Sequence, residues 1–436
     1  MVLRPTFFLL AAVGPLMALG GYASPVLLQF VWPWQILIIA LAIASYAMAG
    51  KAENLVVERK FDRVLSVRER NLVRVVLTND GDDEIAFTFR DEVPPEFDAE
   101  ENEFEVRLLP GERREYRYHV TPVRRGDFFF LDSFVRINGP LHLAARVVRM
   151  DTKEIVRVYP NVLALRKFDL LKQRGHLRQI GIRRSRLKGV GTDFESLREY
   201  VSGDDIRKVE WKATARRHRL MVKEYEAERN QSIVIVLDYG RLMMAEVEGV
   251  VKLDLVLDAA LMLGNAAANA NDMLGLLVHA DRLEKWLPPA RGRAQVGRVI
   301  EALHALQAVE EEPDLRGAMD YLGSRWKRRS LVVVFTEIES VDTAKDLLAT
   351  LSPLARRHLC LVVTVADPKH RSMLNPAGET LYDEFIRASA RLYQEERDEA
   401  KRLLNAGGVK TLDSEPQDLA ADLVNFYMDV KATAAL

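Results

Sequence analysis

The first 50 residues contain a long stretch without charge. No charged side chain occurs between Phe7 and Gly50, although 29% of the whole chain is charged. The turn-forming run GGYASP at 20–25 divides this stretch into two apolar segments, each near the ~20 residues that a helix needs to cross a bilayer. The pattern predicts a transmembrane hairpin over 1–50, with spans at about 5–22 and 27–49. A cleaved signal peptide is the competing interpretation, but its basic region would hold only Arg4, and the second span would remain.

The flanking charges predict the orientation of this hairpin. Arg4 precedes it and Lys51, Arg59 and Lys60 follow it, while the short turn carries no charge. The positive-inside rule then places both ends, and the globular remainder, in the cytoplasm. The single cysteine, Cys360, lies in an apolar run and is expected to be a buried small hydrophobe, which agrees with a reducing compartment.

Residues 52–162 have the pattern of short strands. Apolar and polar side chains alternate in REYRYHV (114–120), and turn clusters such as NDGDD (79–83) and PGE (110–112) separate the runs. Five or more strands at this spacing predict an antiparallel sandwich of immunoglobulin-like type. The acidic run DAEENE (98–103) is expected to be a solvated loop rather than a metal site.

The next segment, 163–230, begins with a basic linker. Nine Lys or Arg residues and one acid lie between Arg166 and Lys188. A solvated connector, contact with anionic lipid head groups and nucleic-acid binding remain alternatives. Base-stacking aromatic residues are nearly absent and the net charge of the chain is −1, so nucleic acid is the least favoured partner.

Residues 231–436 alternate buried strands with helices. Continuous apolar runs such as SIVIVLD (232–238) and SLVVVFTEI (330–338) predict parallel strands, and the alternation predicts a doubly wound α/β domain. Ligands of such sheets bind at the carboxyl ends of the strands, where Asp238, Thr336–Glu337 and Asp367 are expected. The sequence has no GxxxxGK[ST], GxSxG or HExxH motif, so no enzymatic activity and no catalytic residue is predicted.

One segment carries a resemblance to a known family. The run GTDFESLREYVSGDDIRKVEWKATARR (191–217) and the following VIVLDYGRLMM closely resemble the signature of the bacterial domain-of-unknown-function family 58. The similarity covers most of the chain, and it implies that 231–436 is a von Willebrand factor A-like domain. It also implies a multi-pass protein of the bacterial inner membrane that partners an AAA+ ATPase of the MoxR type, in protein complex assembly or maturation. The signature positions quoted for this resemblance include Phe194, Arg198, Tyr200, Gly203, Asp204, Asp205, Arg207, Trp211 and Arg216.

The resemblance also implies a test for a metal site. Domains like von Willebrand factor A often bind Mg²⁺ with a DxSxS loop, a Thr and a further Asp. Here Asp238 remains, both serines are lost, Asp314 lies near the Thr position, and Glu337 replaces the last acid. A degenerate magnesium site at these three residues is therefore possible but disfavoured, and no cofactor is predicted.

The signature itself has three interpretations. Its acids could form a catalytic pair, its cations could bind a polyanion, or the two sets could pair as a polar latch. We expect the third, a polar latch that holds a domain in place. Asp204 and Asp205 would begin a short helix, arginine side chains would form bidentate pairs with carboxylates, and Trp211 would anchor in the α/β domain. The predicted function is a membrane-anchored cytoplasmic scaffold that binds protein partners. A cell-envelope hydrolase and a metal-dependent adhesion module are the alternatives.

Overall fold

The computed structural model describes residues 1–22, 24–62, 64–173, 181–182, 193–201, 204–226, 231–374 and 380–433. It divides into two compact units, Met1–Tyr159 and Pro160–Leu436. Each unit is built around its own hydrophobic core.

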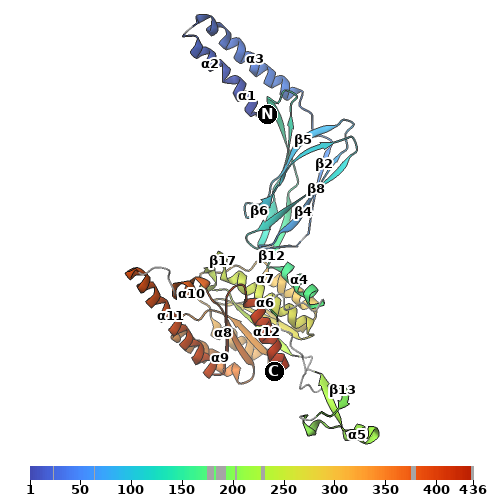
Figure 1. Ribbon diagram of the computed structural model, residues 1–436, viewed down its shortest axis with the longest axis vertical. Coiled ribbons are helices and arrows are strands. Elements are labelled where there is room, and N and C mark those ends of the chain that lie inside the picture. The colour runs from blue at the N-terminus through green and yellow to red at the C-terminus, as the bar shows by residue number, and fades with distance from the viewer. Residues whose placement is uncertain are drawn as a thin grey trace. The chain divides into compact units, whose positions relative to one another are not determined.

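The first unit begins with apolar helices (Figure 1). These are α1 (Pro5–Ala11), α2 (Val13–Gly20), the 3-10 turn η1 (Pro25–Leu27) and α3 (Leu28–Ala47). Among the described residues, one helical stretch, Pro25–Ala47, is long and apolar enough to cross a membrane, with a mean hydropathy of 2.1. Pro5–Gly20 is apolar but shorter, and at 1.5 Å per residue it reaches roughly 24 Å, against ~30 Å of bilayer core.

A side chain of α3 donates a hydrogen bond to a backbone carbonyl at the end of α1. Pro15 lies in α2 and lacks an N–H, so the carbonyl of Ala11 receives no helical hydrogen bond from it. The Gln35 Nε2 amide donates to that carbonyl at 2.9 Å. An otherwise unpaired carbonyl would be costly in an apolar environment, so this bond stabilises the pairing of the two helices.

A β-domain (55–159) completes the first unit. One sheet has the order β2-β4-β8-β6, a second has β1-β11-β10-β5-β7, and a third has β3-β12-β9. Alternation places Tyr118 and Val120 of β8 in the core, as the sequence predicts. The strands are β1 (Val2–Leu3), β2 (Leu55–Phe61), β3 (Val64–Ser66), β4 (Asn71–Asn79), β5 (Ile85–Asp91), β6 (Phe97–Glu100), β7 (Glu103–Leu108), β8 (Arg113–Pro122), β9 (Gly126–Phe130), β10 (Ser133–Asn138), β11 (Ala144–Met150) and β12 (Glu154–Tyr159).

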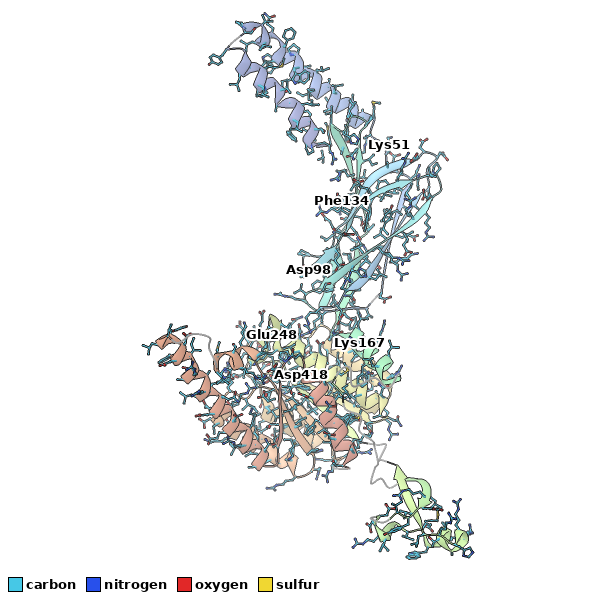
Figure 2. The ribbon with its side chains drawn as sticks, in the orientation of Figure 1. Lys51, Asp98, Phe134, Lys167, Glu248 and Asp418 are labelled. Carbon is cyan, nitrogen blue, oxygen red and sulfur yellow. The ribbon has the colours of Figure 1, made fainter. Side chains whose placement is uncertain are left out.

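The acidic run DAEENE is not a loop, contrary to the expectation from sequence. Its residues form the end of β6, a tight turn at Glu101 and the start of β7. Because β6 pairs with β8 and β7 pairs with β5, the run carries the chain from one sheet to another. Buried Phe97 and Val106 hold the two strands in the core. Figure 2 shows Asp98 of this run far from Lys51, which follows α3.

The N-terminal helices are attached to the β-domain at two places. Val2 and Leu3 of β1 pair with Ala145 and Ala144 of β11. At the other attachment, the end of α3 contacts the loop after β10. A Cβ on Gly139 would lie 2.0 Å from the Ser45 carbonyl oxygen, so only glycine permits this approach.

The second unit, here the α/β unit, has a six-stranded sheet in the order β19-β18-β15-β20-β21-β22. All neighbouring pairs are parallel except β18 with β19. The parallel strands, numbered in chain order, are arranged 2-1-3-4-5, so the order reverses between β15 and β20. Their bounds are β15 (Ser232–Asp238), β18 (Met273–His279), β19 (Leu283–Arg291), β20 (Leu331–Phe335), β21 (Leu359–Val365) and β22 (Lys410–Ser414).

Helices cover both faces of this sheet (Figure 1). One core contains residues of α4, α6, α7 and α12, and the other contains residues of α8, α9 and α11. The supposed basic linker thus contributes a helix, because Leu165 and Phe168 of α4 are buried in the first core. The helices are α4 (Val162–Gln173), α6 (Lys252–Asn269), α7 (Arg293–Leu303), α8 (Leu315–Arg325), α9 (Val341–Ala355), α10 (Pro368–Leu374), α11 (Leu381–Ala406) and α12 (Leu419–Ala432).

Candidate docking site at the carboxyl ends of the parallel strands

Two strand ends meet where the strand order reverses. Asp238 is the last residue of β15, and Thr336 directly follows β20. The Thr336 hydroxyl donates to Asp238 Oδ2 at 2.9 Å, and the Gly240 backbone N–H donates to Oδ1 at 2.8 Å. Asp238 is buried, and burial raises the pKa of its carboxyl while these two hydrogen bonds partly oppose the rise.

The loop after β15 is closely packed. A Cβ on Gly240 would lie 2.7 Å from the Glu311 carbonyl oxygen and 3.1 Å from Asp238 Oδ1. The same Glu311 carbonyl accepts a hydrogen bond from the Arg241 backbone at 3.0 Å. A side chain at position 240 would therefore clash with its neighbours, so glycine is required there. The close packing of this loop holds Asp238 in one position.

The acid after β20 is paired with a lysine. Glu337 is buried, and Lys252 Nζ lies 3.2 Å from its carboxylate. The Val365 backbone donates to the other oxygen at 3.3 Å. Burial raises the pKa of Glu337, and the charges of Lys252 and Arg397 oppose this shift. The cation at this carboxylate is thus supplied by the chain itself, from the first residue of α6.

The third acid predicted for a metal site has a local role. Asp314 precedes α8 and accepts a hydrogen bond from the Gly317 backbone at 2.9 Å, as a helix N-cap does. Asp238, Asp314 and Glu337 each have separate partners. Within the described residues, no three His, Cys, Asp or Glu side chains are grouped so that they could hold a metal ion. The residues present do not form the magnesium ligand set that the resemblance implies.

A cleft of about 1010 Å³ opens beside these groups, at the carboxyl ends of β21 and β22. Its walls come from α10, α11 and the short hairpin of β16 (Glu246–Val247) and β17 (Val250–Val251). Lys252 also lines it, so the cleft is continuous with the Glu337 pair. Ligand sites of doubly wound sheets lie at this end of the strands.

Buried charges form the floor of the cleft. Arg397 of α11 donates to Asp413 of β22 at 2.6 Å, and Lys401 lies 3.1 Å from the same carboxylate. Burial opposes the charge on Arg397, but Asp413 and Glu337 outweigh it and raise the pKa of the guanidinium. Burial likewise raises the pKa of Asp413, and the two cations more than reverse this, so the net shift is downward.

The walls of the cleft are apolar and aromatic. Tyr382 and Phe385 of α11 are each 74% exposed. Deeper along the same helix, Tyr393 packs edge-on against His370 of α10 with 4.5 Å between ring centroids. Thr380 and Asp383 form a capping box that starts α11 beside the cleft. The cleft thus combines paired charges on its floor with aromatic side chains on its walls.

The signature segment forms a small lobe, here the signature lobe (193–201 and 204–226). Strands β13 (Asp193–Glu199) and β14 (Met221–Glu226) pair in an antiparallel hairpin. Arg198 forms a bidentate ion pair with Asp204: Nη1 donates to Oδ2 at 2.6 Å and Nη2 donates to Oδ1 at 2.7 Å. Asp205 accepts from the Arg207 backbone at the start of the 3-10 turn η3 (Ile206–Lys208).

Most of the remaining signature residues are exposed on the signature lobe or lie beyond the described residues. Trp211, the first residue of α5 (Trp211–Arg217), is 65% exposed, so its expected anchoring in the α/β domain is not seen. Val209, Met221 and Val222 are buried in the lobe instead. Arg207 and Arg216 are exposed. Tyr200 is partly buried, and its backbone N–H donates to the Leu220 carbonyl. Gly203 and the side chain of Phe194 lie outside the described residues.

Sequence reasoning missed the cleft because it missed α11. A signal was available: the capping box of Thr380 and Asp383 precedes apolar residues at helical spacing, including Ile386 and Tyr393. Arg397 and Lys401 follow one turn apart on the same helix. Their pairing with Asp413 depends on a strand that follows α11, so it cannot be read from local pattern.

Curated relatives are distant. A protein of Mycobacterium tuberculosis (strain ATCC 25618 / H37Rv), described as uncharacterized, is 24% identical over 200 residues, which are 45% of this chain and 62% of the relative. A protein of Mycobacterium bovis gives the same values. The match therefore spans less than two thirds of the length of these relatives.

Solved structures resemble parts of the chain weakly. An aerotolerance-related membrane protein from Bacteroides fragilis is 14% identical, with a TM-score of 0.30, and the match covers 45% of this chain and 98% of that one. BatB from Bacteroides thetaiotaomicron is 14% identical, with a TM-score of 0.30 and coverage of 46% and 98%. The CARDB domain of a Pyrococcus furiosus protein is 18% identical, with a TM-score of 0.17 and coverage of 24% and 91%.

A family model matches the part of the chain that contains most of the signature and five of the six strands of the α/β sheet, namely β15, β18, β19, β20 and β21. Residues 196–384 match the family described as "Protein of unknown function DUF58". This is the family whose signature the sequence resembles, and over this region the resemblance is confirmed.

Proposed function

We propose that this chain is a membrane-anchored binding protein whose α/β unit, of von Willebrand factor A-like type, docks a protein partner in the cytoplasm. The family resemblance names a MoxR-type AAA+ ATPase as that partner, in the assembly or maturation of protein complexes. The order of the parallel strands and the acid at the end of β15 support the domain type.

The β1–β11 pairing supports a two-span anchor in this proposal. Val2 and Leu3 pair with β11, and Leu55 begins β2 of the same unit. This pairing supports an arrangement in which the residues before and after the apolar helices lie on one side of the membrane. If both ends of the helical segment lie on the same side, the segment crosses the membrane an even number of times. Lys51 beyond α3 and Arg4 before α1 then favour the cytoplasmic side.

The cleft carries the docking part of the proposal. Its wall exposes Tyr382 and Phe385, and large aromatic side chains left in solvent beside a cleft are typical of protein-binding sites. The carboxylates nearest the strand ends, Asp238 and Glu337, are buried and already bonded within the chain. This arrangement favours recognition over the hydrolase and adhesion alternatives.

A binding measurement tests the proposal. The full chain in lipid nanodiscs is titrated with a purified MoxR-type ATPase, with and without nucleotide, and compared with the variant Phe385→Ala. The matched control is Leu392→Ala, since Leu392 is 67% exposed on the same helix but does not line the cleft. We expect Phe385→Ala to weaken binding at least about tenfold, as loss of an aromatic anchor does. Absence of binding, or equal loss in both variants, contradicts the proposal.

A further inference from the structure

The buried charges under the cleft are not balanced. Three cations, Lys252, Arg397 and Lys401, stand against two carboxylates, Glu337 and Asp413, and all five side chains are at most 21% exposed. Three ion pairs connect them: Lys252 pairs with Glu337, and both Arg397 and Lys401 pair with Asp413. The floor therefore has one positive charge in excess, in a place where solvent screens poorly.

The other acids near the cleft lie at its margin. Asp398, which pairs with Lys401 at 2.9 Å, is 39% exposed and does not line the cleft. Glu246 is exposed, and the Asp367 carboxylate accepts from the Lys369 backbone at the start of α10. Glu415 is paired with Arg371. Asp398 balances part of the charge of Lys401 from a partly exposed position, where solvent screens the pair, and the other three acids are solvated or bonded elsewhere.

Arg397 has hydrogen-bonding capacity left. Its Nη1 donates to the Tyr393 hydroxyl at 3.2 Å, and its Nη2 donates to Thr364 and Asp413. Nε makes no hydrogen bond to the described residues, and the side chain lines the cleft. A guanidinium has five N–H donors and suits a planar carboxylate.

The apolar walls extend beyond the cleft. Phe385 and Met373 line it and are 74% and 45% exposed, and Leu381, at the start of α11, is 84% exposed outside it. A small-molecule site encloses most of its ligand. Here the apolar surface continues onto the open face of α11, so the occupant that fits is a segment of a protein.

We propose that the cleft binds a segment of the protein partner in which a carboxylate side chain is flanked by apolar residues. The carboxylate reaches the floor at Arg397 and Lys401, and the apolar residues pack against Phe385 and Met373. A phosphate-rich polyanion fits less well, because Glu246, Asp367 and Glu415 line the margin that it would have to pass. This inference rests on the proposed docking function and names the chemistry that the site recognises.

Peptide selection tests the inference without knowledge of the partner. Short displayed peptides are selected on the full chain in nanodiscs, and bound sequences are compared with those selected on Phe385→Ala. We expect wild-type selection to enrich peptides with Asp or Glu between apolar residues, and Phe385→Ala to lose them. Since Phe385 is exposed, this variant should fold normally. Enrichment of basic peptides, or of the same peptides on both proteins, overturns the inference.

A double-mutant cycle then locates the carboxylate. The best peptide and its Glu→Gln or Asp→Asn version are titrated against wild type and Lys401→Gln, with Lys410→Gln, at the exposed first position of β22, as the control. The amide peptide should bind wild type about tenfold more weakly, and this difference should shrink to less than about twofold on Lys401→Gln. An unchanged difference overturns the inference.

The two proposals fail separately. ATPase binding that depends on Phe385, combined with peptides that show no need for an acid, overturns the inference and leaves the docking function standing. Acid-dependent peptide binding without any binding of the ATPase supports the inference and overturns the choice of partner.

Discussion

At the scale of single residues, His279 is the unusual group of the α/β unit. It ends β18, is 1% exposed, and lies in register with Asp238 of the neighbouring strand. Neither ring nitrogen makes a hydrogen bond among the described residues. Burial lowers the pKa of the imidazole from 6.5 to about 4, against weaker opposing effects of the Ala280 backbone and the Asp314 carboxylate. The ring is therefore neutral when the protein is folded.

This histidine should make the fold sensitive to acid. Above pH 6.5 the ring is neutral in both states, whereas between pH 6.5 and 4 only the unfolded chain takes up the proton. Stability should therefore be lost across this window, by about 3 kcal/mol at its acid end. His279→Leu should remove that part of the pH dependence. Urea unfolding at several pH values, followed for both proteins, measures the difference, and parallel stability curves would contradict the assignment.

At the scale of elements, a buried ion pair fixes the last helix to the sheet. Lys431 of α12 lies 2.6 Å from Asp272, which precedes β18, and both side chains are at most 4% exposed. The Tyr427 hydroxyl donates to the same carboxylate, and the Gln231 backbone donates to its other oxygen at 3.2 Å. Burial and the neighbouring Asp272 raise the pKa of Tyr427.

Removing one partner of this pair should be costly. Lys431→Met leaves Asp272 without its cation, and we expect a loss of about 3 kcal/mol in the free energy of unfolding. The double variant Lys431→Met/Asp272→Asn should recover part of it, because no buried charge remains. Lys410→Met, at an exposed position of β22, is the control. Urea unfolding with hydrogen exchange of the α12 amides measures the effect; an undisturbed α12 in Lys431→Met would show that the pair is not stabilising.

Strands that are buried on both faces could be predicted from the sequence, whereas the edge strand β19 and the helix α4 could not. The continuous apolar runs of β15, β18, β20 and β21 identify strands covered on both faces, and all four are present. β19 was missed because Pro288 and Pro289 argue against a strand, and it tolerates them as the antiparallel edge. The sequence predicts a basic linker where α4 lies, because Leu165 and Phe168 stand among basic residues.

The sequence predicted where the acids of the candidate site lie, but not which residues they bond to. The sequence places Asp238, Glu337 and Asp367 at the carboxyl ends of strands, and the structure has them there. The partners of these acids could not be foreseen. Lys252 reaches Glu337 from a helix that follows a different strand, and Thr336 reaches Asp238 only because β15 and β20 are neighbours. Such contacts depend on strand order, which local pattern does not contain.

At the scale of the whole molecule, the proposed anchor would determine how the chain is oriented in a membrane. Cys360 is fully buried, and burial raises the pKa of its thiol to about 12, so it should not react with maleimides. Single cysteines can therefore be introduced without removing it. Tyr22, between α2 and α3, is 97% exposed, and the Glu53 side chain beyond α3 is 76% exposed.

Labelling at these two positions should distinguish the sides of the membrane. In spheroplasts, an impermeant maleimide should label Tyr22→Cys readily and Glu53→Cys only after lysis. This follows from two spans with the globular part in the cytoplasm. Labelling of Glu53→Cys in intact spheroplasts would reverse the orientation, and protection of both positions would favour a hairpin that does not reach the far surface.

The pairing of Val2 and Leu3 with β11 has a consequence for the order of assembly. Ala144 and Ala145 are made long after the apolar helices have left the ribosome. In the proposed membrane-anchored form, β1 stays unpaired until β11 has been made, so insertion of the helices precedes completion of the sheet. In that form, translation that stalls between these segments would leave β1 without its partner strand, and an unpaired strand edge promotes aggregation.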